Sequence, residues 1–297
     1  MKLSLKAKDS IFGYTLILPT LIAFGVFVYR PLIDTFIISF HEWNMIGSKT
    51  HVGLNNYIEL LSSKSFQSAL INTGYYAILL ILFIIVLPTF VVAGIYYISE
   101  KTKNFYRVAI FTPAIISLGI ASIVWSWFYN PIGGLLGRIL ESLGYTPVNW
   151  LSSSKTALFA IVIVVTWKAF GYSFLLIMAG LTGIPVSVLD AARVDGATGF
   201  KLWFHIILPL ISPTLLFVFV FTLSMSAEYV FTPIHVLTGG GPQNATTNLM
   251  FEIWRQAFQW FRVGTSSAIA IIVFVIFTAL MLLKNIISKR IISYDER

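Results

Sequence analysis

The chain has 297 residues, of which 57% are hydrophobic, 15% aromatic and 11% charged, and its net charge is +8. A soluble domain carries about 25% charged residues, so this composition excludes a soluble enzyme, a disordered chain and a collagen-like chain. Cysteine is absent, which removes disulfides, thiolate metal sites and cysteine nucleophiles. The composition predicts an integral membrane protein, in which the basic excess belongs to the cytoplasmic side rather than to a nucleic-acid interface.

Six apolar stretches are long enough to cross a bilayer, which takes roughly 20 residues. They cover residues 12–29, 74–99, 108–129, 157–181, 206–227 and 266–283. The first is not followed by a small-residue cleavage site, so we interpret it as a retained helix. Prolines within the stretches are compatible with spans, because neighbouring helices can re-satisfy the freed backbone groups. The sequence predicts an all-α fold, a single membrane domain of six transmembrane helices over residues 1–297.

The distribution of Lys and Arg predicts the orientation of these spans. If the N-terminus is cytoplasmic, Lys and Arg are about three times denser in the inner segments than in the outer ones. This pattern predicts an N-in, C-in topology. The three outer connections are expected to form short interfacial helices and turns, and the largest inner connection runs from about residue 182 to 205.

The sequence lacks the patterns of several catalytic sites. No G-x-x-x-x-G-K-[ST] loop is present, so the chain is not expected to bind ATP by itself. The histidines are not spaced as metal or haem ligands, and no serine lies in a nucleophile-elbow pattern. Carboxylates at mid-membrane, which proton-driven carriers use, are also missing, the nearest being Glu228. We therefore expect a transport subunit with no catalytic residues, and a secondary carrier that acts alone is the rival hypothesis.

The inner loop before the fifth span has the pattern of a helix–turn–helix at the membrane surface. Pro185 is expected to end the fourth span, and Ser187 to cap the next helix with Asp190 three residues further on. Gly196 and Gly199 then permit a sharp turn. An ordinary amphipathic connection at the interface would show the same pattern.

This loop resembles the EAA signature of binding-protein-dependent ABC importer permeases, which is E-A-A, three residues, Gly, nine residues and I-x-L-P. Both gaps of the signature are matched. The matching residues are Asp190, Ala191, Ala192, Gly196, Ile206, Leu208 and Pro209. The one departure is Asp for Glu at position 190, which keeps the charge and shortens its reach. The resemblance implies that these residues form a coupling helix that docks into a partner ATPase.

Shorter blocks extend the resemblance over nearly the whole chain, to the MalF-like carbohydrate permeases. They lie in the three outer connections, at residues 29–32, 39–44, 52–57, 128–131, 133–136, 237–242 and 244–247. These blocks favour sugar import over the import of amino acids, inorganic phosphate or peptides. The glycerol-phosphate permeases share most of the blocks and remain an alternative.

The resemblance implies a type I ABC importer in the cytoplasmic membrane of a bacterium or an archaeon. This chain would form half of the translocation pathway, in contact with membrane lipid. Its partners would be a second related permease, two ATPase subunits and an external sugar-binding protein. ATP and Mg would be bound by the ATPase, and this chain would bind no cofactor, metal or nucleic acid.

The same resemblance implies that substrate contacts come from the fourth and fifth spans. The candidates are Lys168, Ala169, Tyr172, Ser224, Ser226, Ala227, Glu228 and Val230. An intramembrane lysine is costly and so is a functional candidate, although an ion pair or a packing contact would also account for Lys168. Tyr172 lies one turn further on the same face and could stack on a sugar or pack in the core. Glu228 could accept sugar hydroxyls or pair with Lys168.

Overall fold

The computed structural model describes residues 5–96 and 98–291, which form helices and one two-stranded hairpin. Lys2 and Arg297, which entered the orientation prediction, lie outside the described residues. The helices are α1 (Leu5–Phe24), α2 (Arg30–Ile38), α3 (Asn55–Ser62), α4 (Lys64–Ile81), α5 (Leu87–Ile95), α6 (Glu100–Ile115), α7 (Leu118–Phe128), α8 (Leu135–Ser142), α9 (Ala157–Thr182), α10 (Val186–Val194), α11 (Gly199–Leu202), α12 (Leu208–Leu210), α13 (Ser212–Tyr229), α14 (Phe231–Pro233), α15 (Leu249–Trp254) and α16 (Val263–Ile291). The strands are β1 (His41–Glu42) and β2 (Thr50–His51).

Short π-helical turns join several of these helices into longer ones. Gly25–Tyr29 links α1 to α2, Leu82–Val86 links α4 to α5, and Trp203–Ile207 links α11 to α12. Ile234–Thr238 and Arg255–Gln259 extend α14 and α15. Three of the candidate spans, Phe12–Ile38, Lys64–Ile95 and Ser212–Thr238, therefore run through such joints without a break.

The number of candidate membrane-spanning helices equals the predicted six only if one broken pair of helices is counted as a span. Among the described residues, five helices are long and apolar enough to cross a membrane: Phe12–Ile38, Lys64–Ile95, Ala157–Thr182, Ser212–Thr238 and Val263–Leu283. A further pair, Lys101–Ile115 and Leu118–Phe128, passes the same test together and is bent by 97°. The N-in, C-in orientation stays a prediction.

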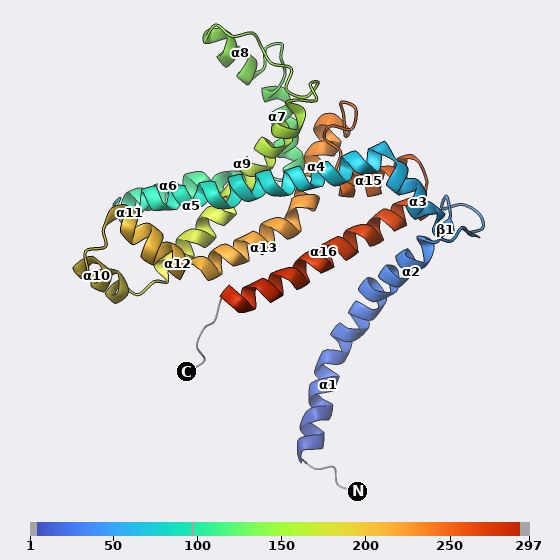
Figure 1. The fold of residues 1–297 in the computed structure, drawn as a ribbon, viewed down its shortest axis with the longest axis horizontal. Coiled ribbons are helices and arrows are strands. Elements are labelled where there is room, and N and C mark those ends of the chain that lie inside the picture. Colours follow the sequence, from blue (N-terminus) through green and yellow to red (C-terminus); the bar gives the residue numbers. More distant parts are fainter. Residues whose placement is uncertain (1–4, 97, 292–297) are drawn as a thin grey trace. The chain divides into compact units, whose positions relative to one another are not determined.

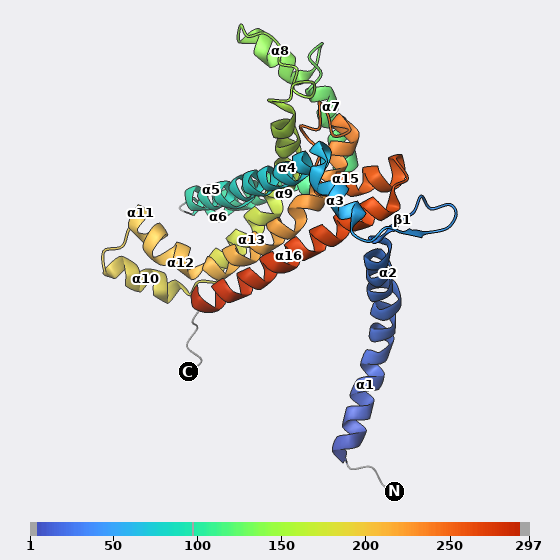
Figure 2. The same ribbon diagram turned by 45° about the vertical axis from the view of Figure 1, so that its right-hand side comes forward.

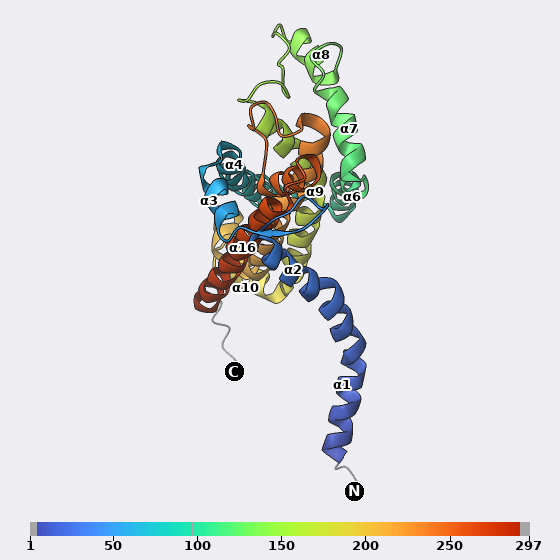
Figure 3. The same ribbon diagram turned by 90° about the vertical axis from the view of Figure 1, so that its right-hand side faces the viewer.

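The prediction of one continuous helix over residues 108–129 is therefore wrong. α6 ends at Ile115, and α7 begins at Leu118 after two residues of extended backbone (Figure 3). The hydroxyl of Ser117 accepts a hydrogen bond from the backbone N–H of Ile120, which makes Ser117 the N-cap of α7. The local sequence thus starts a new helix within an apolar stretch.

The predicted start of the fifth span at residue 206 is also wrong. Residues 199–210 form a separate short helix, and α13 begins at Ser212 and continues to residue 238 through α14 and its π turn. Pro213 explains the boundary, because it has no N–H to donate to the carbonyl of Pro209 one turn earlier. The second span likewise begins earlier than predicted, at Lys64 rather than at residue 74.

The contacts within the chain define two compact units, which we describe separately. Unit 1 comprises Met1–Ser63 and Ile253–Ala279, and unit 2 comprises Lys64–Glu252 and Leu280–Arg297. The proposal of a single membrane domain over residues 1–297 stays a prediction.

Unit 2 is built around α9. Its apolar window is 56% buried, against 33% or less for the other candidate spans. α4, α5, α6, α7 and α13 all pack on it, and in the ribbon view α9 crosses α5 and α6 and runs beside α13 (Figure 1). The largest apolar cluster joins buried residues of α5, α9 and α13 to the loop that follows α9, including Phe174, Ile177 and Trp203. α9 is therefore the element that positions the candidate site.

In unit 1, the hairpin of β1 and β2 is held against α3. β1 and β2 pair antiparallel, with His41 opposite His51. The side-chain amide of Asn56 in α3 donates to the carbonyl oxygens of Ser39 and His41, at 2.8 and 3.0 Å. Asn56 is 6% exposed, so one buried amide holds the hairpin against α3.

Candidate functional site

The loop with the EAA signature forms the predicted helix–turn–helix, and α10, α11 and α12 lie together after α9 (Figure 2). Gly196 follows α10 with a φ of +81°, and Gly199 begins α11 with a φ of +52°. Residues with a β-carbon rarely adopt such angles, so the two glycines permit the turn as predicted. The backbone N–H of Ala197 donates to the carbonyl of Ala192 at 2.9 Å and closes the end of α10.

The predicted coupling residues do not all share one surface. A groove of about 540 Å³ lies between α10 and the segment after it. Its lining residues are Ser187, Val188, Ala191, Ala192, Asp195, Ala197, Lys201 and Ile206. Of the candidates, Ala191, Ala192 and Ile206 line this groove, whereas Asp190, Gly196, Leu208 and Pro209 do not. The small side chains leave a concave surface that a partner helix could approach closely.

The capping role expected of Ser187 is wrong. α10 begins at Val186 with Pro185 as its N-cap, and no side chain caps it. Proline sets the backbone at this position, so the helix starts one residue before Ser187 and places that serine inside its first turn. Asp190 instead pairs with Arg193, at 2.9 Å between Oδ1 and Nη1, and Arg193 also donates to the Tyr96 hydroxyl at 3.1 Å.

We predict that Asp190→Lys leaves the fold intact and weakens coupling to a partner. Both side chains of the Asp190–Arg193 pair are about half exposed, at 59% and 46%, and an exposed pair contributes about 0–1 kcal/mol. The melting temperature of the purified protein should therefore change little. ATP hydrolysis stimulated by the binding protein should fall at least tenfold, because the charge presented to a docked partner is reversed. Unchanged stimulation would remove Asp190 from the coupling surface.

A second space lies between α4, α9 and α13 in unit 2, where the substrate contacts were expected. Its lining residues are Leu80, Ile84, Val165, Ala169, Tyr172, Ser173, Phe221, Thr222, Met225, Ser226 and Tyr229. We call it the inner cavity. Three of the predicted pathway residues, Ala169, Tyr172 and Ser226, line it. Its volume is about 20 Å³, roughly the space of one water molecule, so no larger solute fits between these helices in this conformation.

The other predicted pathway residues lie outside the lining of this cavity. Ser224 donates to the carbonyl oxygen of Val220 in its own helix, at 2.9 Å. Ala227 and Val230 are buried, and Glu228 is exposed. The hydroxyl of Ser226 also bonds to its own helix, to the carbonyl oxygen of Leu223 at 2.8 Å. The polarity of these serines is thus partly satisfied within α13.

The pairing of Lys168 with Glu228, which was one interpretation of the sequence, is not formed. Lys168 is 9% exposed, and its ammonium group donates to the carbonyl oxygen of Ala114 at 3.0 Å. The hydroxyl of Tyr172 donates to the same oxygen at 3.4 Å. A backbone carbonyl at the end of α6 therefore takes the place of the expected carboxylate.

Sequence reasoning missed a set of amide and hydroxyl groups that fix the loop of residues 244–248 in unit 2. Asn248 is fully buried, and its amide donates to the carbonyl oxygen of Ala227 at 2.8 Å. Asn72 of α4 donates to the carbonyl oxygens of Asn244 and Thr247, each at 3.0 Å, and the Tyr76 hydroxyl donates to that of Thr246 at 2.9 Å. These hydrogen bonds join residues that are far apart in the sequence, so no local sequence pattern could predict them.

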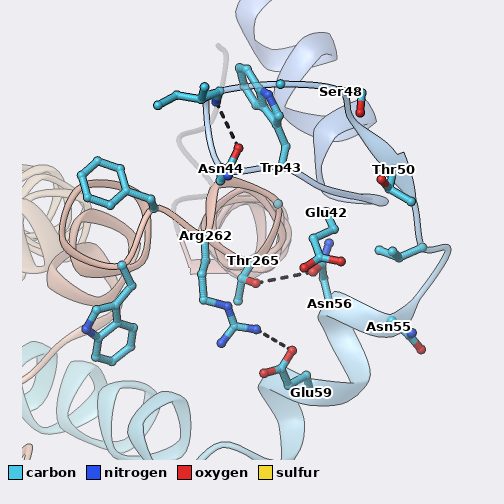
Figure 4. A pocket seen from close by; sticks show the side chains of 16 residues that line it. Glu42, Trp43, Asn44, Ser48, Thr50, Asn55, Asn56, Glu59, Arg262 and Thr265 are labelled. Carbon is cyan, nitrogen blue, oxygen red and sulfur yellow. Dashed lines mark hydrogen bonds and ion pairs between the residues drawn. The ribbon is translucent and has the colours of Figure 1, made fainter.

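Unit 1 contains a larger cavity of about 730 Å³, which sequence reasoning also missed (Figure 4). It is lined by the hairpin, α3 and the start of α16. The labelled lining residues are Glu42, Trp43, Asn44, Ser48, Thr50, Asn55, Asn56, Glu59, Arg262 and Thr265. Arg262 pairs with Glu59 at 2.6 Å, and the backbone N–H of Val263 donates to the carbonyl of Trp43 at 2.9 Å. Two of the outer sequence blocks, 39–44 and 52–57, thus come together in one polar cavity.

We predict that Ala169→Leu blocks transport by filling the inner cavity. Ala169 is 9% exposed, and three added carbons exceed the space of about 20 Å³ beside it. Overpacking of this kind typically costs about 1–3 kcal/mol, so the protein should still assemble. Solute uptake should fall at least tenfold. Ala179→Leu is the matched control, because Ala179 is exposed on the same helix. This variant should transport normally. Wild-type uptake by Ala169→Leu would place the pathway elsewhere.

A helical membrane bundle with a helix–turn–helix that matches the EAA signature defines a transport permease. Residues 79–293 match the family described as "Binding-protein-dependent transport system inner membrane component", and the chain belongs to that family. It is therefore a multi-pass membrane protein and a permease subunit of an ABC importer, with the type I fold.

Relatives and solved structures match the chain over almost its full length. The trehalose/maltose transport system permease protein MalF of Thermococcus litoralis is 36% identical, over 92% of this chain and 92% of that protein. The probable ABC transporter permease protein YurN of Bacillus subtilis is 32% identical, over 93% of this chain and 96% of that protein. The sn-glycerol-3-phosphate permease UgpA of Yersinia enterocolitica is 30% identical, over 95% of each chain. A crystal structure of a bacterial alginate ABC transporter, in complex with a pentasaccharide-bound periplasmic protein, matches with a TM-score of 0.85 and 25% identity, over 96% of each chain.

Proposed function

We propose that this permease imports an uncharged oligosaccharide or disaccharide. The observation that supports a neutral solute is the lining of the inner cavity, whose residues include tyrosine, serine, threonine and apolar side chains and neither Lys nor Arg. Aromatic rings stack on the apolar faces of sugars, and hydroxyls exchange hydrogen bonds with them. A phosphate ester carries negative charge, and its sites are typically built from Arg, Lys or helix N-termini.

The relatives include permeases for both candidate substrate classes, a sugar and a phosphate ester. The trehalose/maltose permease supports a sugar, and the glycerol-phosphate permease supports a phosphate ester, at 36% and 30% identity. Lys168 immediately precedes Ala169, which lines the cavity, but its ammonium is bonded to the backbone of α6. This arrangement favours the sugar.

The importer that we propose contains four kinds of subunit. A second related permease would complete the translocation pathway, two ATPase subunits would bind ATP and Mg, and an external binding protein would deliver the sugar. The groove beside α10 fits the ATPase contact, because four of its eight lining residues are Ser or Ala, which leave room for a partner's side chains. The polar cavity of unit 1 lies in segments predicted to be outside, which makes it a suitable surface for the binding protein.

Transport by the reconstituted importer tests the proposed substrate. Proteoliposomes that contain this chain, its co-purified partners and the binding protein would be given labelled maltose, trehalose, an alginate oligosaccharide and sn-glycerol 3-phosphate. We expect ATP-dependent uptake of a neutral sugar, with little uptake of the two anions. Preferential uptake of either anion would contradict the proposal, and uptake without ATP would support the rival hypothesis of a secondary carrier.

A further inference from the structure

The end of α6 leaves a backbone carbonyl without a helical partner in an apolar part of unit 2. α6 ends at Ile115, and Ile116 and Ser117 are extended, so the helix does not continue to supply an N–H to the carbonyl of Ala114. Such groups are costly to leave unsatisfied where water is excluded. Ala114 is 3% exposed, so its carbonyl oxygen needs a donor from the protein.

That donor is supplied by α9. The ammonium of Lys168 and the hydroxyl of Tyr172 both donate to the carbonyl oxygen of Ala114, at 3.0 and 3.4 Å. The two side chains are one helical turn apart and therefore lie on one face of α9. The ammonium also lies at the negative end of the α6 dipole, where a positive charge is stabilising.

Gly171 lies between these two residues and lets the backbones meet. A β-carbon at Gly171 would lie 2.7 Å from the carbonyl oxygen of Ile110 and 2.8 Å from the Cα of Phe111. Both are backbone atoms of α6, so neither can rotate away. The ring of Tyr172 packs edge-on against Phe111, with ring centroids 5.4 Å apart. Three positions of α9 thus hold the last turns of α6.

We infer that Lys168, Gly171 and Tyr172 form a clamp that holds the end of α6 in place at the break before α7, and that Lys168 is a positioning residue for transport rather than a substrate contact. Tyr172 also lines the inner cavity, so the same side chain contacts both the cavity and the break in the third span. A change in the cavity would then be transmitted to the α6–α7 bend through Tyr172. The inference rests on the permease role and holds for any solute.

The bend can be measured directly, because the chain contains no cysteine. Spin labels would be attached at Val108→Cys on α6 and Ile123→Cys on α7, which are 70% and 62% exposed. The distance between them would be measured in the purified importer by pulsed electron paramagnetic resonance. A second pair at Ile163→Cys and Ala179→Cys, both exposed and both on the unbroken α9, is the control.

We expect one narrow distance distribution across the bend in the wild type. Lys168→Met should broaden or shift this distribution without changing the control pair, and Lys168→Arg should restore it. Tyr172→Phe, which keeps the ring and removes one hydrogen bond, should give a smaller change. An unchanged distribution in Lys168→Met would overturn the clamp, as would a change in both label pairs, which would indicate general loss of folding.

A transport measurement distinguishes a positioning role of Lys168 in transport from a role in helix packing alone. Lys168→Met should lower the amount of solute imported per ATP hydrolysed at least tenfold, because the bend no longer follows the state of the cavity. Lys168→Arg should recover most of this ratio, since it retains a cation that can reach the carbonyl. A ratio equal to that of the wild type in Lys168→Met would show that Lys168 has no positioning role in transport.

Discussion

Substitution of Gly264 by alanine is expected to destabilise unit 1 strongly, although it adds only one methyl group. A β-carbon at this position would collide with the backbone carbonyl oxygen of His41 and would lie 3.0 Å from the side-chain amide of Asn56. That carbonyl already accepts a hydrogen bond from Asn56, so it cannot move without breaking a partly buried hydrogen bond. We expect a loss of about 3 kcal/mol in unfolding free energy, at the upper end of typical overpacking costs.

The measurement is the thermal unfolding of the purified protein, together with protease cleavage in the hairpin loop of residues 43–49. Gly264→Ala should lower the melting temperature and accelerate cleavage, because the hairpin and the start of α16 can no longer pack together. Gly74→Ala is the matched control. No atom lies within 4 Å of a β-carbon there, so this variant should behave like the wild type. Equal stability of the two variants would contradict the close approach of α16 to the hairpin.

Substitution of Gly196 by valine is expected to abolish coupling while leaving the membrane bundle intact. Gly196 has a φ of +81°, which disfavours a β-branched residue by roughly 1–2 kcal/mol or more. No atom lies within 4 Å of a β-carbon at this position, so the effect comes from the backbone conformation and not from a collision. The turn between α10 and α11 should open and distort the groove beside α10.

ATP hydrolysis stimulated by the binding protein is the quantity to measure for this variant. Gly196→Val should reduce the stimulation at least tenfold, with normal insertion and normal recovery of the protein from membranes. Gly196→Asn is the matched control, because asparagine tolerates a positive φ better than other residues with a side chain. It should retain most of the stimulation. Loss of stimulation in both variants to the same extent would argue against the turn conformation as the cause.

Much of the bundle could be predicted from hydropathy, because a membrane span requires a long apolar stretch. The same criterion failed at residues 108–129, since the break at Ile116 and Ser117 keeps the composition of a span while changing its backbone. The local signal was Ser117, a helix-capping residue in an otherwise apolar stretch. Pro213 gave a similar signal for the start of α13.

The candidate site was predictable where its chemistry is local. The glycine at position 196 specifies a turn through its own backbone freedom, and that expectation is confirmed by its φ. The partner of Lys168 was not predictable, because sequence spacing does not show that a broken helix places the carbonyl of Ala114 beside it. The cavity of unit 1 depends on residues 42–59 meeting residues 260–265, which lie about 200 positions further along the chain.

We propose that α10 and the turn after it couple this chain to an ATPase, and site-specific cross-linking would detect that contact. A photoreactive maleimide would be attached to Ala191→Cys in the otherwise cysteine-free chain, with Ile123→Cys as the control on α7. Ala191 is exposed and lines the groove beside α10. We predict that Ala191→Cys forms a covalent adduct with an ATP-hydrolysing subunit and that Ile123→Cys does not. An assembled, transporting protein with no such adduct at Ala191 would show that α10 does not contact the ATPase.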